Sequence, residues 1–160
     1  RAQLDELAEA ELKAALAKDA RLPHANFLLG QTALFRGRLE EGIQLLKREL
    51  EINPADAMTL YRLGDAHVRR LEWDLAAAAL TRSMWLNPYF SGPYVLLGKV
   101  HQQRGDLGAA EGMLRRALQH DPNNRTAHYM LGQLLQQTGR PEEARRELET
   151  AERLQAPSER

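Results

Sequence analysis

The chain has 160 residues, 43% of them hydrophobic, and its 22 basic residues balance its 22 acidic ones. A formal net charge of zero gives no electrostatic bias toward nucleic acid or an anionic membrane surface, and no apolar run is long enough to span a membrane. The chain has no cysteine, which excludes disulfides and thiolate metal sites. The length suits one domain, and no secretory signal is visible, so the compartment, cytoplasm or periplasm, stays open.

Hydrophobic spacing predicts about nine helices. The first covers about 3–18 and has no partner helix before it. A helix pair follows over about 25–36 and 40–52, and the same pattern recurs until a final helix over about 141–154. Pro54, Pro88 and Pro122 stop the second helix of a pair. Glycine just past a helix end accepts the left-handed conformation that closes the helix. Gly37, Gly105 and Gly139 take this place in three pairs, and Leu71 takes it in the remaining one.

A Leu-Gly pair recurs every 34 residues within the first helix of each pair. The four copies are Leu29-Gly30, Leu63-Gly64, Leu97-Gly98 and Leu131-Gly132. Glycine inside a helix costs about 1 kcal/mol relative to alanine, so four glycines in one register indicate a packing need. We expect each glycine to let its helix approach the second helix closely. The matching small residues there are Gly42, Ala76, Ala110 and Ala144.

The motif resembles the tetratricopeptide repeat (TPR), which has Leu-Gly at positions 7–8, alanine at 20 and proline at 32 of a 34-residue unit. The units are 23–56, 57–90, 91–124 and 125–158, and residues 1–22 fit as a partial repeat that supplies only a second helix. The resemblance implies an all-α, right-handed superhelical solenoid of antiparallel helix pairs. We expect more repeats before residue 1 in the parent protein, or self-association through the N-terminal helix.

In TPR proteins one face of the first helices lines a concave groove, and the resemblance assigns a peptide-binding groove here. Its N-terminal half is apolar and aromatic, and its C-terminal half is rich in glutamine. Position 5 carries Phe27, Tyr61, Val95 and Tyr129, which either contact a ligand or pack neighbouring helices. The remaining groove residues are Gln31, Phe35, Asp65, Arg69, Lys99, Gln102, Gln133 and Gln136. Asp65 is expected to face Lys99 on the next unit or to pair with Arg69 on its own helix.

Three aromatic residues crowd the junction after the second unit. Trp85, Tyr89 and Phe90 lie within six residues, and Tyr89 and Phe90 take positions where the family commonly has small polar loop residues. They form either an anchor pocket on the groove rim or a local cluster that fills the space left by Gly92.

No catalytic motif is present. His67 and His101 share position 11 of adjacent units, but two imidazoles do not complete a zinc site, and position 11 is a packing site. No nucleophile–base pair or phosphate-binding glycine loop occurs. We therefore predict no enzyme activity, no metal and no cofactor.

The sequence predicts a protein-interaction scaffold that binds a peptide or partner helix in its concave groove, with no nucleic-acid partner and no membrane insertion. The alternative is a non-catalytic accessory array of a larger enzyme or of a secretion or assembly machine.

Overall fold

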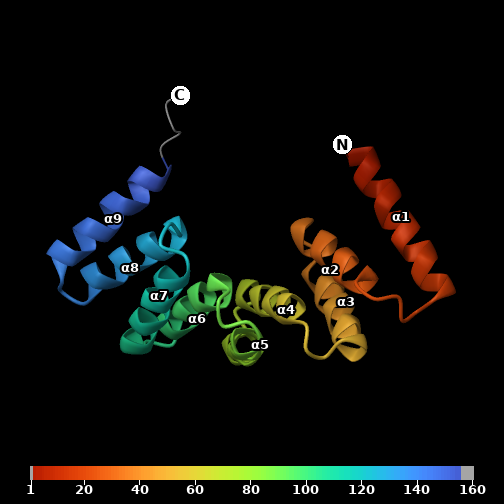
Figure 1. Cartoon of the computed structure of the whole chain (residues 1–160), viewed down its shortest axis with the longest axis horizontal. Helices are drawn as coiled ribbons and strands as arrows, with labels where there is room; N and C mark the ends of the chain where they lie inside the picture. The colour runs from red at the N-terminus through yellow and green to blue at the C-terminus, as the bar shows by residue number, and fades with distance from the viewer. Residues whose placement is uncertain (1, 156–160) are drawn as a thin grey trace.

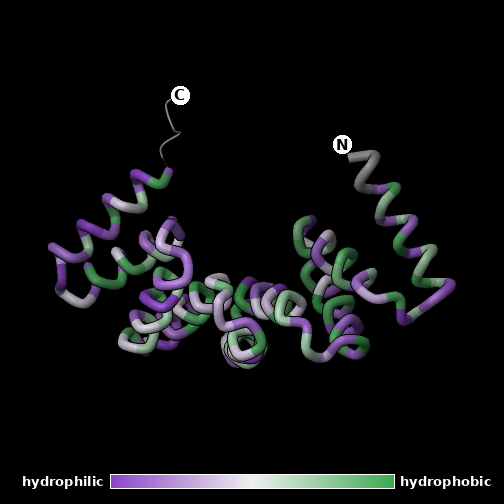
Figure 2. The backbone as a smooth tube through the Cα atoms, in the orientation of Figure 1, coloured by the Kyte–Doolittle hydropathy of each residue, from purple (hydrophilic) through white to green (hydrophobic). Residues whose placement is uncertain are grey.

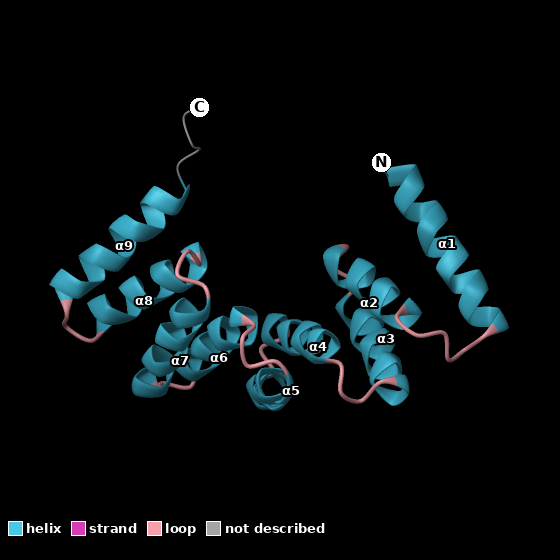
Figure 3. Ribbon diagram, viewed as in Figure 1, coloured by secondary structure: helices cyan, strands magenta, loops and turns pink. Residues whose placement is uncertain are grey.

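The structure is a computed structural model that describes the backbone of residues 2–155 and the side chains of residues 6–155. Over this range the chain forms nine α helices and no strand (Figure 3). The helices are α1 (Ala2–Lys18), α2 (Ala25–Phe35), α3 (Leu39–Ile52), α4 (Ala57–Arg69), α5 (Trp73–Leu86), α6 (Ser91–Gln103), α7 (Leu107–His120), α8 (Arg125–Gln137) and α9 (Pro141–Gln155). Residue 1 and residues 156–158 of the predicted units lie outside the described residues.

The helices form a curved array, with α1 and α9 at the two ends of the arch (Figure 1). Four pairs pack closely: α2 with α3, α4 with α5, α6 with α7, and α8 with α9. Helices α2, α4, α6 and α8, the inner helices, also contact one another in series. Helices α3, α5, α7 and α9, the outer helices, pack against inner helices, and over the described residues their backbones do not approach one another, although Arg115 of α7 pairs with Glu143 of α9 at 3.4 Å. Such contacts place the inner helices on the concave side, because elements on the inside of a bend lie closest together.

Residues with a left-handed backbone separate the two helices of each pair, as the sequence predicts. The φ angles are 75° at Gly37, 79° at Gly105, 75° at Gly139 and 60° at Leu71. The amide of the following residue bonds back into the preceding helix, as in Arg38 N–H to Ala33 O (2.8 Å), which closes the helix end. Leu71 therefore adopts the same turn as the three glycines.

The interior glycines are needed for close helix contact, although the contacting residue is mainly a leucine. A Cβ added at Gly64 would lie 2.5 Å from Leu80 Cγ, and one at Gly132 would lie 2.6 Å from Leu148 Cγ. The predicted small residues take part through their backbone, since a Cβ at Gly132 would also lie 3.2 Å from Ala144 O. Each glycine thus leaves room for a leucine of the second helix of its own unit. These leucines are Leu46, Leu80, Leu114 and Leu148.

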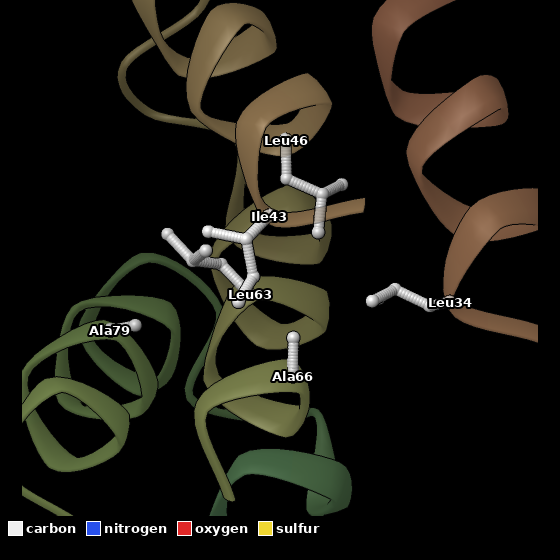
Figure 4. Packing of buried hydrophobic residues seen from close by; sticks show 6 residues of the cluster. All are labelled: Leu34, Ile43, Leu46, Leu63, Ala66 and Ala79. Atoms are coloured by element: carbon white, nitrogen blue, oxygen red, sulfur yellow. The ribbon is translucent and has the colours of Figure 1, made fainter. Parts of the chain in front are cut away.

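The hydrophobic core runs as linked clusters along the array. One cluster joins Leu34, Ile43 and Leu46 of the first unit to Leu63, Ala66 and Ala79 of the second (Figure 4). Hydrophobic and hydrophilic segments alternate along the helices (Figure 2), so that each unit buries one face against its neighbour. Stability therefore depends on contacts within and between adjacent units.

Among the described helices, α1 packs against α2, and its side chains also reach the turn that follows α2. Its Glu9 carboxylate accepts hydrogen bonds from Lys13 (2.8 Å), Arg36 (2.6 Å) and Arg38 (3.2 Å). The hydrogen bonds from Lys13 and then Arg38 hold the pKa of Glu9 below its usual range. None of the described helices has both the length and the hydrophobicity needed to cross a membrane.

Candidate protein-interaction surface

The concave side carries the residues that the sequence assigns to a groove, because they share one face of the inner helices. Most are solvent-accessible: Phe35, Arg69, Lys99, Tyr129, Gln133 and Gln136 are exposed, and Phe27, Gln31, Tyr61, Asp65 and Gln102 are half-buried. These eleven side chains therefore differ in how far solvent reaches them.

Val95 differs from the prediction. Its side chain is only 7% exposed and packs in a cluster with Tyr94, Ala117 and Ala127. It therefore belongs to the core beneath the concave face and offers no groove surface. Leu34 and Val68, also on inner helices, are each 3% exposed and likewise pack in the core.

The N-terminal half of the concave side is built around Tyr61. The Tyr61 ring meets the Phe90 ring edge to face at 4.8 Å between centroids, and the Arg62 guanidinium lies 5.4 Å from the Tyr61 ring centroid. Burial, and next the nearby Asp65 carboxylate, raise the pKa of the Tyr61 phenol. Phe27 packs partly against the core cluster of the first unit. Phe35, at the end of α2, is 89% exposed, so it is the most accessible aromatic group of this half.

Asp65 pairs along its own helix. Its carboxylate lies 2.8 Å from Arg69 Nη2, and Arg69 also donates to Leu34 O at 3.2 Å. The expected contact between Asp65 and Lys99 is absent from the ion pairs of the described side chains, because Arg69 takes the carboxylate. The ion pair is exposed on its Arg69 side, so it adds less than about 1 kcal/mol to stability.

The C-terminal half of the concave side is polar. Tyr129 is 48% exposed, and Gln133 Nε2 donates to its hydroxyl at 2.8 Å. Gln102 and Gln136 lie at equivalent positions of α6 and α8 and add amide donors and acceptors. Lys99 supplies a positive charge at the boundary between the two halves.

The three aromatic residues of the predicted rim do not form one pocket. Phe90 contacts Tyr61, and a Cβ at Gly92 would lie 2.6 Å from Phe90 Cζ, so Phe90 fills the space left by that glycine. Tyr89 instead faces His120, with 6.0 Å between ring centroids. Trp85 lines a separate hollow with Pro54, Ala55, Arg82 and Leu86.

The histidines have local partners. His67 is 5% exposed, and its Nδ1 lies 2.6 Å from Glu72 Oε2. His101 Nδ1 lies 3.8 Å from Asp106, and His128 Nδ1 lies 2.5 Å from Glu147. Among the described residues no three His, Asp or Glu side chains gather as a metal site would need.

Sequence reasoning missed two surfaces. A hollow between α1 and α2 is lined by Ala8, Leu12, Leu28, Gln31, Thr32 and Phe35, among others. A second surface lies on α5, where Leu75 and Trp85 are 54% and 77% exposed. The helical pattern of α5 could have indicated it, because these apolar residues lie outside the buried stripe of that helix.

Stacked helix pairs with an accessible concave side define a helical-repeat solenoid, a class of protein-interaction scaffold. Two models of the tetratricopeptide repeat match the chain, over residues 6–57 and over residues 101–160. The chain belongs to the tetratricopeptide repeat family, and its fold is the right-handed superhelix of helix pairs that the sequence predicts. No curated protein sequence matches the chain.

Solved structures share this fold. A crystal structure of MamA has a TM-score of 0.83 at 24% identity, covering 91% of this chain and 85% of that one. A MamA fragment from Desulfovibrio magneticus RS-1 has a TM-score of 0.86 at 19% identity, covering 98% and 88%. YrrB, a TPR protein with an unusual peptide-binding site, has a TM-score of 0.78 at 22% identity, covering 96% and 79%.

Proposed function

We propose that the concave side binds an extended peptide or a partner helix from another protein. The observation that carries this proposal is that the inner helices present accessible side chains, which are aromatic and apolar toward the N-terminal end and rich in glutamine toward the C-terminal end. Phe35 and Tyr129 are 89% and 48% exposed, and aromatic side chains in such positions give a large contact area at low entropic cost.

The polarity of the surface indicates how a ligand would lie. Phe27, Phe35 and Tyr61 suit apolar side chains at one end. Gln102, Gln133 and Gln136 at the other end can bond to the main-chain amides of an extended peptide. The ligand would therefore combine an apolar segment with a segment recognised through its backbone.

The test is a selection of displayed random peptides on the purified chain, repeated with the variant Phe35→Ala/Tyr61→Ala/Tyr129→Ala. The control is a variant with the exposed outer residues Gln44→Ala and Arg116→Ala. Peptides bound by the parent and the control, and lost by the triple variant with unchanged circular dichroism, support the proposal. Peptides that bind the triple variant as tightly as the parent contradict it.

We infer that the segment acts by binding and not by catalysis, either alone or as an accessory array of a larger enzyme or of a secretion or assembly machine. The hollow between α1 and α2 favours a second candidate, self-association through the N-terminal helix. Leu12 is only half-buried there, and Leu7 on α1 is 62% exposed. A Leu12→Glu variant that loses a concentration-dependent dimer in sedimentation velocity would support that candidate, and an unchanged dimer would exclude it.

A further inference from the structure

The outer side of the second unit differs from that of the other complete units. Six exposed residues on α5 and its flanking turns follow one line, which we name the outer stripe. They are Leu71, Leu75, Ala78, Arg82, Trp85 and Tyr89. Five of the six are apolar or aromatic. The corresponding line of the last unit is Gly139, Glu143, Arg146, Thr150, Arg153 and residue 157, and that of the first unit is Gly37, Glu41, Gln44, Arg48, Glu51 and Ala55.

The apolar groups of the outer stripe are highly accessible. Trp85 and Tyr89 are 77% and 80% exposed, and Leu71 and Leu75 are 67% and 54% exposed. The two aromatic groups alone offer roughly 300 Å² of contact surface. With the leucines, the patch reaches the size that marks an interaction site on a soluble protein and extends toward the roughly 800 Å² per partner of a standard interface.

The side chain of Leu71 packs little within the described chain, and its backbone has a conformation that is strained for leucine. Its φ of 60° lies in the region that favours glycine, and the three counterparts are Gly37, Gly105 and Gly139. The leucine nevertheless points to solvent in large part. A strained residue whose side chain has little contact indicates a role outside its own fold.

The spacing of the outer stripe is the same when it is read from either end. Within α5 the stripe residues Leu75, Ala78, Arg82 and Trp85 are separated by three, four and three residues, which is the spacing of a helical contact seam. Leu71 and Tyr89 lie in the turns beyond the two ends of α5 and extend this surface. In an antiparallel pair of α5 helices related by a two-fold axis, the facing residues of the two copies come from the helix itself. Leu75 lies opposite Trp85, and Ala78 lies opposite Arg82. Large groups thus meet at both ends, and alanine allows close approach near the centre.

The ends of α5 have surfaces that fit this arrangement. One hollow is lined by Leu71, Trp73 and Leu75 together with the charged residues Glu72, Asp74 and Arg104, and the other includes Trp85, Pro54 and Ala55. The two-fold axis would place the aromatic end of one copy at the first hollow of the other. In Figure 1, α5 lies at the outer side of the bend, so a second copy can reach it without meeting the ends of the array.

The charges around the stripe are satisfied within the chain. Asp74 pairs with Arg104, and Glu72 pairs with Arg70 and His67. Arg82 is turned toward the preceding loop, where Nη2 donates to Pro54 O at 3.2 Å. No carboxylate of this surface therefore needs a basic partner protein.

We propose that the outer stripe is a self-association surface through which two copies of this chain pair back to back by their α5 helices. This leaves both concave sides free and does not depend on the function proposed for them.

The test is sedimentation velocity of the parent over a concentration series. We expect a monomer–dimer equilibrium. Trp85→Glu and Leu75→Glu should each raise the dissociation constant by more than about tenfold, because aromatic and well-packed anchors dominate interfaces. The controls Phe35→Glu and Leu7→Glu alter equally exposed groups elsewhere and should leave the dissociation constant unchanged. A parent that is monomeric throughout the series overturns the proposal, as does a dimer that Leu7→Glu abolishes and Trp85→Glu does not.

A cysteine experiment tests the two-fold geometry without removing an anchor. The chain has no cysteine of its own, so any disulfide reports the introduced groups. We expect Ala78→Cys mixed with Arg82→Cys to cross-link into heterodimers on mild oxidation. Each variant alone should cross-link less. In its homodimer the two cysteines, one from each copy, are offset by four residues along the paired helices, which is about 6 Å. Equal or stronger cross-linking by the single variants contradicts the antiparallel arrangement.

Discussion

Leu80 of α5 packs directly over Gly64 of α4, and a Cβ at residue 64 would lie 2.5 Å from Leu80 Cγ. The leucine is fully buried, so it has no free space to move into. This contact fixes the distance between the two helices of the second unit, and its equivalents recur at Gly30, Gly98 and Gly132.

Gly64→Ala should therefore lower the free energy of unfolding by about 1–3 kcal/mol, because the core would be overpacked. Gly112→Ala is the matched control. Gly112 lies inside α7, and nothing lies within 4 Å of an added Cβ, so alanine should stabilise the protein by up to about 1 kcal/mol. Denaturant unfolding measures both changes, and shifts of the same sign would contradict this account of the repeat glycines.

Leu71→Gly should stabilise the monomer. A leucine in the left-handed conformation costs about 1–2 kcal/mol, and replacing it by glycine removes this cost. Glycine also has greater conformational freedom in the unfolded chain, which offsets part of the stabilisation. We expect a net increase of about 0.5–1 kcal/mol, measured by thermal unfolding at low protein concentration. The reverse change, Gly105→Leu, should destabilise by a similar amount at the same turn of the next unit. A destabilising Leu71→Gly change would show that the side chain contributes more to the fold than its exposure indicates.

Glu49→Leu should cost about 2–3 kcal/mol. Glu49 is only 1% exposed, and its carboxylate accepts hydrogen bonds from the backbone N–H groups of His24 (2.9 Å) and Phe27 (3.3 Å). It thus caps the start of α2 from a different helix, and removing it leaves two amides without this partner. Glu51→Leu, at an exposed site of the same helix, should change stability by no more than about 0.5 kcal/mol. Chemical denaturation compares the two variants.

The docking of α1 should weaken in acid. Because the pKa of Glu9 is lowered in the folded chain, its contribution is complete above the ordinary glutamate pKa of about 4.3. The contribution is lost as the pH falls through the lowered value. NMR signals of α1 and Arg36 should therefore shift as the pH falls below about 4. Glu9→Gln should abolish this step, and Glu11→Gln, at an exposed site on α1, should preserve it. A step that persists in Glu9→Gln assigns the change to another group.

The fold can be predicted from the sequence because the residues that determine each helix pair lie close together in the chain and recur in every unit. The 34-residue spacing of the Leu-Gly pairs fixes the register of every helix pair, and even the left-handed turn at Leu71 follows from its equivalence to Gly37. The helix bounds agree to within about two residues, which is the usual ambiguity of helix ends.

The candidate surface is less predictable, because it depends on packing between units. Helical register places Val95 on the concave face, but Val95 packs with Tyr94, Ala117 and Ala127 of the third and fourth units and is buried. The junction aromatics are close in sequence, yet Phe90 turns to Tyr61 and Tyr89 turns to His120. The cap formed by Glu49 links residues 22 and 25 positions apart, and no local pattern indicates such a bond.

The contact pattern of the array also determines how it responds to force. The inner helices touch in series, whereas the backbones of the outer helices do not approach one another over the described residues. Bending the arch therefore changes the gaps between outer helices at the expense of a few exposed side-chain contacts, such as the Arg115–Glu143 ion pair, and the helix pairs themselves stay intact. The array behaves as a spring whose stiffness comes from the contacts of each inner helix with the inner and outer helices of the preceding unit. Its curvature, and with it the width of the concave side, adjusts at small cost to the core of each unit.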